Sequence, residues 1–460
     1  MYTLKKGTDI TAKVITDIIT HNETLKDRYD RMEAYYIGIQ AILDRQKVEG
    51  LSNNKVMINH AKYIVDTNYG YLMGNPVEYQ VTEGYEIQPV VDAYKQQTIN
   101  DLDSEIAKDV GIFGLQYEYV YANEEAEPRS AEIDNRNCVL VYDTTLEHKK
   151  LFGIIYRAVM KEDKLDYYEV IYCDAKVTRE YKLKGEENLK QIKNDKPHSF
   201  GAVPLIQYRN NPDYLGDFEP VTTLIDAYNL LQSDRVNDKE QLVDAILCLI
   251  NMDFTDEQVK QLKEHRVLAG IPADGDVKYL IKTLNEADTD VLRKTIENDI
   301  HKISMVPNMS DTNFIGNSSG VAIKYKLLAF EQNISNKERH FEKGLMERFE
   351  LYNNFLITKS QMVKIPLEEL DAVFKRNLPQ NDFEISQMIN NLTGIVDKET
   401  LVGQLSFIKD AKETIEIAEA EETNTPPTPS YDPAYANNEI NDANITTNTG
   451  GNVDAGTNIE

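Results

Sequence analysis

Two stretches of this chain, residues 217–252 and 321–357, carry helical patterns too long for an ordinary globular domain. If unbroken, they would form helices about 50 Å and about 55 Å long. Asp217 is a suitable N-cap for the first, and Pro220 is tolerated in its first turn. Helices of this length are expected to bridge regions of a molecule or to line an assembly, so they constrain the fold more than any other feature.

A compact insert, residues 253–287, separates the first long pattern from a further helix. Thr255 and Gln258 stand in a capping-box relation, which predicts a short helix. The run "RVLAGIPADGDVKYLIKTL" predicts two short strands around a turn. That turn consists of Pro272, Ala273, Asp274 and Gly275.

A second helix is predicted from the N-cap Asp288 to Pro307, which ends it. Its apolar stripe is Leu292, Ile296, Ile300 and Ile303. The later long helix has a clearer stripe, formed by Phe341, Leu345, Phe349, Tyr352 and Leu356. Its polar middle, "EQNISNKERH", predicts a kink or a segment that crosses solvent.

The first 216 residues predict an α+β region with a mainly antiparallel sheet. Helical spacing runs through residues 20–45 and 56–74 and through "DSEIAKDVGIFG". Short runs rich in Tyr, Val and Ile follow: "LQYEYVYA", "CVLVYD", "LFGIIYRAVM", "DYYEVIYCD" and "AKVTREYKL". Many of the 27 tyrosines lie here, and we interpret them as half-buried sheet residues rather than ligand contacts.

Near the C-terminus, residues 380–422 predict two or three short helices. Beyond them, residues 423–460 contain no Lys or Arg and almost no large aliphatic side chains. This segment is therefore predicted to be a disordered acidic tail.

Charge and cysteine content exclude several classes of protein. The formal net charge is −27, which argues against a basic DNA-binding patch and against attraction to anionic membranes. It is compatible with DNA passing close by, because a negative surface repels the phosphate backbone and suits a conduit better than a clamp. The three cysteines have no C-x-x-C spacing, which fits synthesis in a reducing cytoplasm. We expect neither a signal peptide nor a membrane span.

A glycine-rich loop, "NMSDTNFIGNSSGVAIKYK", precedes the later long helix and superficially resembles a phosphate-binding loop. A Walker A loop places its lysine directly after the second glycine. Here only three residues separate Gly316 from Gly320, and the first lysine, Lys324, comes a helical turn too late. The loop is therefore not expected to bind a nucleotide.

No other pattern predicts catalysis. The seven histidines are scattered without metal-binding spacing, and neither G-x-S-x-G nor a Cys/His pairing occurs. The carboxylate-rich runs "DRYDRME" and "NEADTD" are typical of solvated faces or helix caps. We expect no catalytic residue, no cofactor and no metal. A helical hairpin with a small domain at its tip instead suits a subunit that stands beside copies of itself in a ring.

Three segments, in order, resemble the SPP1-type portal proteins of tailed bacteriophages. They are "NNKVMINHAKYIVDTNYGYLMGNPVEY", "FGAVPLIQYRNNPDYLGDFEPVTTLIDAYNLLQSDRVND" and "ISMVPNMSDTNFIGNSSGVAIKYKLLAFEQ". The resemblance extends from about residue 20 to residue 420 and does not include the tail. It implies a virion protein, made in the cytoplasm of the host bacterium, that forms a dodecameric ring at one capsid vertex. Double-stranded DNA would pass through that ring without sequence specificity. The implied partners are the terminase, head-completion or adaptor proteins, and capsid and scaffolding proteins.

The resemblance also implies a mainly α version of an α+β fold, with the following parts. They are a wing (1–216), two stem helices (217–252 and 288–307), a clip (253–287), a tunnel loop (308–320), a long kinked helix with the rest of the wing (321–379), a small helical crown (380–422) and the tail (423–460). The turn at residues 272–275 would then contact the terminase and head-completion proteins.

A loop that rings a DNA channel must follow a moving phosphate backbone without gripping it. The implied tunnel-loop residues are Asn308, Ser310, Asp311, Thr312, Asn313, Phe314, Ile315, Gly316, Asn317, Ser318, Ser319 and Gly320. Most are small, neutral and polar, with one acid, Asp311, and their glycines confer mobility. Phe314 and Ile315 are candidates for packing loop against loop, and Lys324 and Lys326 are candidates for facing the channel. An ordinary surface linker remains the alternative for this loop. For the whole chain, the alternatives are a phage nucleic-acid-processing enzyme with an unrecognised site or another structural virion adaptor.

Overall fold

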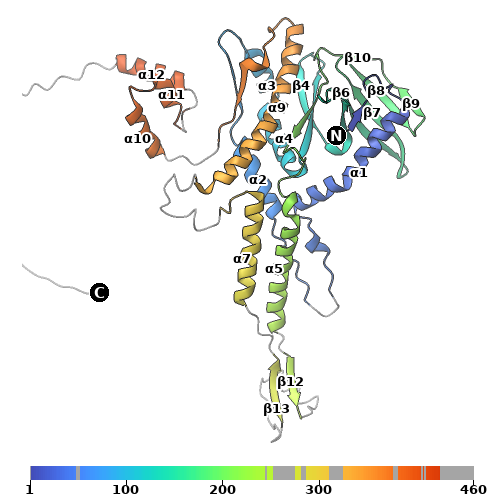
Figure 1. The fold of residues 1–460 in the computed structure, drawn as a ribbon, viewed down its shortest axis with the longest axis vertical. Helices are drawn as coiled ribbons and strands as arrows, with labels where there is room; N and C mark the ends of the chain where they lie inside the picture. Colours follow the sequence, from blue (N-terminus) through green and yellow to red (C-terminus); the bar gives the residue numbers. More distant parts are fainter. Residues whose placement is uncertain are drawn as a thin grey trace, which may run out of the picture. The chain divides into compact units, whose positions relative to one another are not determined.

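The computed structural model describes residues 2–47, 52–243, 246–251, 275–280, 286–309, 325–376, 382–405, 408 and 411–424. The chain divides into two compact units, residues 1–378 and 379–460, which are described separately. The first unit combines helices with antiparallel sheets, so the predicted α+β class is confirmed (Figure 1).

The helices of the first 114 residues come before most of the strands in sequence. They are α1 (Ala12–Ile37), η1 (Ala41–Asp44), α2 (His60–Met73), α3 (Gln88–Gln96) and α4 (Ile99–Phe113). The Thr11 side chain accepts a hydrogen bond from Val14 N at the start of α1, and Gly38, with a left-handed φ of 95°, ends it. α2 confirms the helix predicted over 56–74 and ends before Gly74.

Most of the described strands lie in two sheets, and those that follow α4 include all five predicted runs. The strands of the first unit up to residue 209 are β1 (Tyr2–Leu4), β2 (Glu78–Val81), β3 (Leu115–Ala122), β4 (Pro128–Ile133), β5 (Cys138–Asp143), β6 (Lys150–Lys161), β7 (Lys164–Cys173), β8 (Val177–Lys184), β9 (Asn188–Gln191), β10 (Lys196–Pro197) and β11 (Leu205–Arg209). The larger sheet has the order β1-β5-β6-β7-β8-β10, with β9 also paired to β8, and only the β1–β5 pairing is parallel. The smaller sheet has the order β11-β3-β4.

Each face of the larger sheet is buried by a different partner. Apolar residues of α1, including Ile15 and Ile18, pack against Ile154 and Tyr172 on one face. On the other face, part of the sheet packs on the smaller sheet through Cys138, Leu140, Cys173 and Leu205. A Cβ atom at Gly153 would lie 2.5 Å from Cδ2 of Leu205, so a side chain here would force Leu205 to move.

The first long helical pattern ends earlier than predicted. α5 covers Thr222–Val243, after a 3₁₀ turn η3 (Glu219–Val221), and is followed by a strand, β12 (Ile246–Ile250). β12 pairs antiparallel with β13 (Asp276–Leu280). The prediction of one helix to residue 252 was therefore wrong, because the continuous apolar run "ILCLI" satisfies a strand as well as a helix.

The predicted cap of this helix was also wrong. Asp217 does not cap α5; its carboxylate is buried and forms an ion pair with Lys337. It also accepts hydrogen bonds from Asn68 (2.7 Å) and Asn210 (2.8 Å). A buried carboxylate needs such partners, and they take the place of helix N–H groups.

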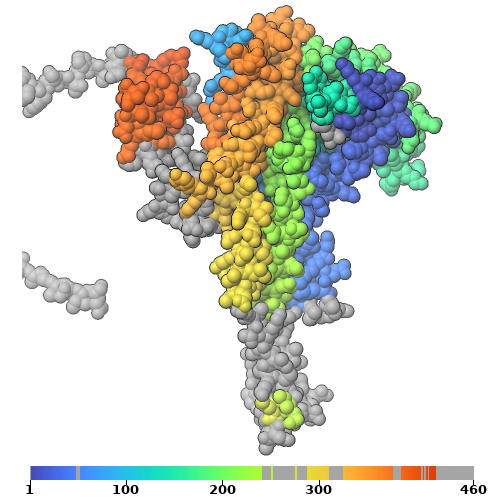
Figure 2. All heavy atoms as spheres, viewed as in Figure 1, coloured from blue at the N-terminus to red at the C-terminus, as the bar shows by residue number. Residues whose placement is uncertain are grey.

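α7 (Glu286–Ser304) returns alongside α5, and the two helices lie in contact (Figure 2). Its start, two residues before Asp288, shows that the predicted N-cap was misplaced. Only half of the predicted stripe faces the protein core. Ile300 is buried and Ile296 packs beside it, whereas Leu292 and Ile303 remain 50% and 51% exposed.

α9 (Leu328–Thr358) is one helix of 31 residues whose predicted stripe is buried. A Cβ atom at Gly344 would lie 2.3 Å from Cε1 of Tyr208, which shows how closely this helix approaches β11. The polar middle does not cross solvent, because Ile334 and Lys337 are both buried. The predicted solvent-crossing segment was therefore wrong, because Lys337 is buried together with its ion-pair partner Asp217. A last strand, β14 (Leu370–Val373), follows the turn η5 (Leu367–Glu369) and pairs antiparallel with β2.

The second unit contains three short helices, as the sequence predicted. They are α10 (Asp382–Leu392), α11 (Lys398–Val402) and α12 (Ala411–Asn424). The side chain of Asp397 caps α11 by accepting a 2.8 Å hydrogen bond from Thr400 N. Lys398 and Glu419 form an ion pair between α11 and α12. Residues 425–460, most of the predicted disordered tail, lie outside the described residues.

Candidate functional site: the ends of the polar loop

The candidate site of this chain is the polar loop between α7 and α9. Of the loop residues named from the sequence, Asn308 is described, while residues 310–320 and Lys324 lie outside the described part. Lys326 is described and lies just before α9. Of the turn at 272–275, only Gly275 is described, immediately before β13. The structure therefore defines the two ends of the loop rather than its middle.

The first end of the loop is held by Tyr63 of α2. Its hydroxyl donates a 2.8 Å hydrogen bond to the carbonyl of Pro307 and accepts a 3.1 Å bond from the N–H of Met309. One side chain thus holds the backbone on both sides of Asn308. The Asn308 side chain in turn donates to Glu297 of α7 at 3.0 Å.

The turn before this end is set by local geometry. Met305 follows α7 with a left-handed φ of 58°. Val306 is buried, and its carbonyl oxygen lies 3.0 Å from Nδ1 of His301. A non-glycine residue with positive φ is uncommon, so the chain direction here is imposed by the surrounding contacts.

The first turn of α9, the helix after the loop, is held by Tyr71, on the same helix as Tyr63. The Tyr71 ring packs against Phe330 with centroids 4.8 Å apart, and its hydroxyl donates to Glu331. Arg376 also contacts Glu331, at 3.4 Å. Tyr63 and Tyr71 are eight residues apart, about 12 Å along the helix axis. One helix therefore holds the start of the loop and the start of the helix that follows it, a relationship that the sequence pattern did not reveal.

Aromatic rings and neutral histidines surround the first end. His301 contacts Tyr63 and His60 edge-on, with centroids 5.6 Å and 5.9 Å apart. Burial, and secondly the proximity of His301, lower the pKa of His60 to about 4. Burial also lowers the pKa of His301. Neither imidazole is expected to be charged at neutral pH, so this histidine pair adds no positive charge beside the loop.

The nearby charged groups of α7 neutralise one another. Arg293 contacts Asp290 at 3.1 Å and Glu297 at 2.8 Å. Glu297 is the same carboxylate that accepts from Asn308. The guanidinium is thus engaged by two carboxylates rather than directed to a phosphate.

α5, which lies beside α7, is held by a polar ladder. Three buried side chains at four-residue intervals, Asn229, Ser233 and Asn237, accept hydrogen bonds from alternate backbone N–H groups of an extended segment. The donors are Ile58, Val56 and Asn54, at 2.9, 2.9 and 2.7 Å respectively. A helix repeats its face every four residues and an extended chain every two, so the two patterns match. These hydrogen bonds explain why polar residues occupy this face of α5.

Among the residues that the structure describes, no group of three or more His, Cys, Asp or Glu side chains could hold a metal ion. In the same part of the chain, no helix has both the length and the apolar character needed to span a membrane.

Comparison with known proteins identifies the family. Residues 15–427 match the family described as phage portal protein, SPP1 Gp6-like. The chain belongs to this family. It is therefore a portal protein, a structural component of a phage particle rather than an enzyme.

Two portal proteins of known phages are similar to it over most of its length. The portal protein of Bacillus phage SPP1 is 25% identical over 410 residues, which cover 85% of this chain and 80% of that protein. The portal protein of Clostridium phage phiCD119 is 20% identical over 384 residues, which cover 79% of this chain and 83% of that protein.

A solved structure, the neck of an empty GTA particle computed with C6 symmetry, contains a chain that aligns with this portal protein. The alignment has a TM-score of 0.42 and 12% identity, and covers 80% of this chain and 90% of that chain. A similarity of that size does not establish a shared fold.

Proposed function

We propose that twelve copies of this portal protein form a ring at one capsid vertex, with the polar loop Asn308–Gly320 facing the channel. The observation that supports this placement is that one helix, α2, holds the start of the loop through Tyr63 and the first turn of the helix after the loop through Tyr71. A polar loop that is anchored at its start and followed by an anchored helix can follow moving DNA while the rest of the subunit stays rigid. Double-stranded DNA would pass without sequence-specific contacts.

The other parts of the subunit are proposed from the resemblance to the portal family. Residues 1–216 and part of 321–379 would form the wing, α5 and α7 the stem, and residues 253–287 the clip. The clip would contact the terminase during packaging and head-completion proteins afterwards. Residues 380–422 would form a small crown, and capsid and scaffolding proteins would contact the outside of the ring.

Weak contact with phosphates is central to the proposal. The loop carries one acid, Asp311, and no basic residue between positions 308 and 320. Basic side chains would neutralise phosphates and hold the DNA, with an affinity that falls steeply with salt. Lys324 and Lys326, at the end of the loop, are the proposed points of closer contact with the backbone.

The ring is tested by negative-stain microscopy of the purified protein. We expect rings with a central channel; a monomer or a filament without a channel under every condition would overturn the proposal. This experiment also tests the alternative of another structural virion adaptor.

The role of the loop needs a second test, in which Gly316→Pro stiffens it. With rings intact, we expect the rate of DNA packaging to fall, since the loop can no longer follow the backbone. An unchanged rate would instead favour an ordinary surface linker.

A further inference from the structure

A small cavity lies next to the buried ion pair between Lys337 and Asp217. It leaves about 10 Å³ for the centre of a water-sized sphere, which is enough for one water molecule and too little for a larger ligand. Its walls are partly apolar, with side chains such as Val110 of α4. Four polar side chains also line it, namely those of Asn68, Arg209, Asn210 and Lys337.

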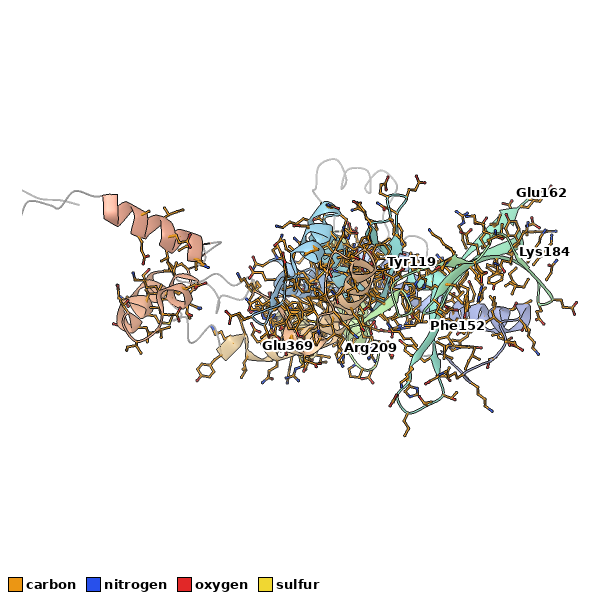
Figure 3. The ribbon with its side chains drawn as sticks, turned by 90° about the horizontal axis from the view of Figure 1, so that it is seen from above. Tyr119, Phe152, Glu162, Lys184, Arg209 and Glu369 are labelled. Atoms are coloured by element: carbon orange, nitrogen blue, oxygen red, sulfur yellow. The ribbon has the colours of Figure 1, made fainter. Side chains whose placement is uncertain are left out.

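The cavity belongs to the helical side of the first unit rather than to the larger sheet. Arg209, which lines it, ends β11 of the smaller sheet. In Figure 3, Arg209 lies on the same side of the first unit as Glu369, away from Glu162 and Lys184 of the larger sheet. The other polar groups come from α2, from the segment before α5 and from α9. Several separate elements therefore meet at this one point.

Asn68 of α2 provides an acceptor without a partner beside this cavity. Its Nδ2 donates a 2.7 Å hydrogen bond to Oδ2 of Asp217. A carboxylate only accepts hydrogen bonds, so this contact fixes which end of the amide is the nitrogen. The side chain is buried, with the residue 2% exposed, and its Oδ1 has no hydrogen-bond partner among the residues that the structure describes. A buried acceptor without a partner costs free energy, so Oδ1 is expected to be satisfied by a bound molecule.

Lys337 of α9 provides donors beside the same cavity. Its ammonium group can donate three hydrogen bonds, and the contact with Oδ1 of Asp217 uses one of them. Burial lowers the pKa of Lys337, although the carboxylate of Asp217 opposes this shift. A further acceptor next to the ammonium would therefore help to keep the buried lysine charged.

These two groups define the chemistry of an occupant. It must donate a hydrogen bond to Asn68 and accept one from Lys337. A cation could contact Oδ1 of Asn68, but it would lie beside the positive charges of Lys337 and Arg209. An anion could contact the ammonium, but it would face the lone pairs of Oδ1. A water molecule both donates and accepts, and it also matches the volume of the cavity.

We propose that one ordered water molecule binds in this cavity, donating to Oδ1 of Asn68 and accepting from Nζ of Lys337. The water joins α2 directly to α9, in addition to the link through Asp217. Asn68 lies on α2 between Tyr63, which holds the start of the polar loop, and Tyr71, which holds the first turn of α9. The water is thus a further part of the contact between the two helices that flank the loop. This inference does not depend on the proposed ring.

A crystal structure of the full chain, at a resolution that shows other buried waters, tests the proposal. We expect an electron-density peak about 2.5–3.2 Å from both Oδ1 of Asn68 and Nζ of Lys337. Crystals soaked in sodium bromide or in rubidium chloride should show no anomalous peak at this position. The absence of a density peak would overturn the inference, and an anomalous peak would assign the site to an anion or a cation instead.

A cavity-filling variant provides a second test in solution. Val110→Ile adds one methyl group at the wall of the cavity, which should displace the water and lower the urea midpoint of unfolding, since Asn68 then loses its partner. Val236→Ile makes the same chemical change at a residue that is 39% exposed, and should leave the midpoint nearly unchanged. A higher midpoint for Val110→Ile would show that the methyl group fills a dry cavity, and would overturn the inference. Microscopy separates the two proposals: rings without this water overturn the inference alone, whereas the absence of rings overturns the proposed function.

Discussion

Arg348 of α9 and Glu118 of β3 form a fully buried ion pair, with Nε 2.8 and 3.0 Å from the two carboxylate oxygens. The same guanidinium contacts Asp103 of α4 at 2.6 Å and donates to the hydroxyl of Tyr208 at 3.1 Å. One side chain thus joins α4, strands β3 and β11 of the smaller sheet, and α9. The pKa of Asp103 is nevertheless raised, because burial outweighs the attraction of Arg348.

Replacing Arg348 with Leu should lower the free energy of unfolding by about 3–5 kcal/mol, because two buried carboxylates lose their cation. Urea denaturation measures the change. Arg157→Leu is the control, since this arginine is 76% exposed, and should cost no more than about 1 kcal/mol. A loss below about 1 kcal/mol for Arg348→Leu would mean that the two carboxyl groups become protonated in the variant at little cost.

The polar ladder on α5 predicts an alternating pattern of amide exchange. The N–H groups of Asn54, Val56 and Ile58 should exchange more slowly than those of Asn53, Lys55 and Met57, since the former donate to α5. Hydrogen exchange monitored by NMR or by mass spectrometry with electron-transfer fragmentation resolves single amides. Equal exchange at the two sets would contradict the ladder.

Ser233→Ala should destabilise the protein by about 1–3 kcal/mol, because it leaves the Val56 N–H without its acceptor in a part-buried site. Thermal or urea unfolding measures the loss. Val236→Ala on the same helix is the control, since Val236 is 39% exposed, and should have a smaller effect. If the two variants lose the same stability, the hydroxyl acceptor has no special role.

The carboxyl of Glu132 predicts a pH dependence of stability. Burial, and secondly the carboxylate of Asp109, raise the pKa of Glu132 from 4.5 to about 7. The unfolded chain releases this proton near 4.5, whereas the folded protein holds it until about 7. This group therefore reduces stability as pH rises from about 4.5 to about 7, by on the order of 2 kcal/mol, with no further change above that range.

Glu132→Gln should remove this part of the pH dependence and stabilise the protein at pH 8. Denaturation curves at several pH values test it, with the exposed Glu147→Gln as the control. A variant whose stability follows the same pH profile as the parent would show that Glu132 titrates normally in the folded state.

Tyr63→Phe should loosen the first end of the polar loop without removing the ring. Both hydrogen bonds of the hydroxyl, to Pro307 and Met309, are lost, at a cost of roughly 0.5–1.5 kcal/mol each. We expect faster amide exchange at Met309 and a loss of roughly 1–3 kcal/mol in the free energy of unfolding. Tyr325→Phe is the control, because Tyr325 is 75% exposed. Unchanged exchange at Met309 would show that other contacts hold this end.

Much of the fold could be predicted because its signals are local. The period-two runs identified the long strands of both sheets, such as Leu115–Ala122 and Cys138–Asp143, and the stripe from Phe341 to Leu356 identified the buried face of α9. The prediction failed where local signals were ambiguous. The run Ile246–Ile250 fits a helix or a strand, and only its pairing with Asp276–Leu280 selects the strand.

The candidate site was also predictable only in part. By itself, the sequence determined the family and the chemistry of the polar loop, because motif order, glycine spacing and the lack of lysines are properties of consecutive residues. The tertiary structure alone decided what holds the loop and the core: Tyr63 with Met309, Tyr71 with Glu331, Lys337 with Asp217, and Arg348 with Glu118. These partners are more than a hundred residues apart, and no local periodicity relates them. A buried charge or hydroxyl finds its partner only when distant elements pack and exclude the water that would otherwise satisfy it.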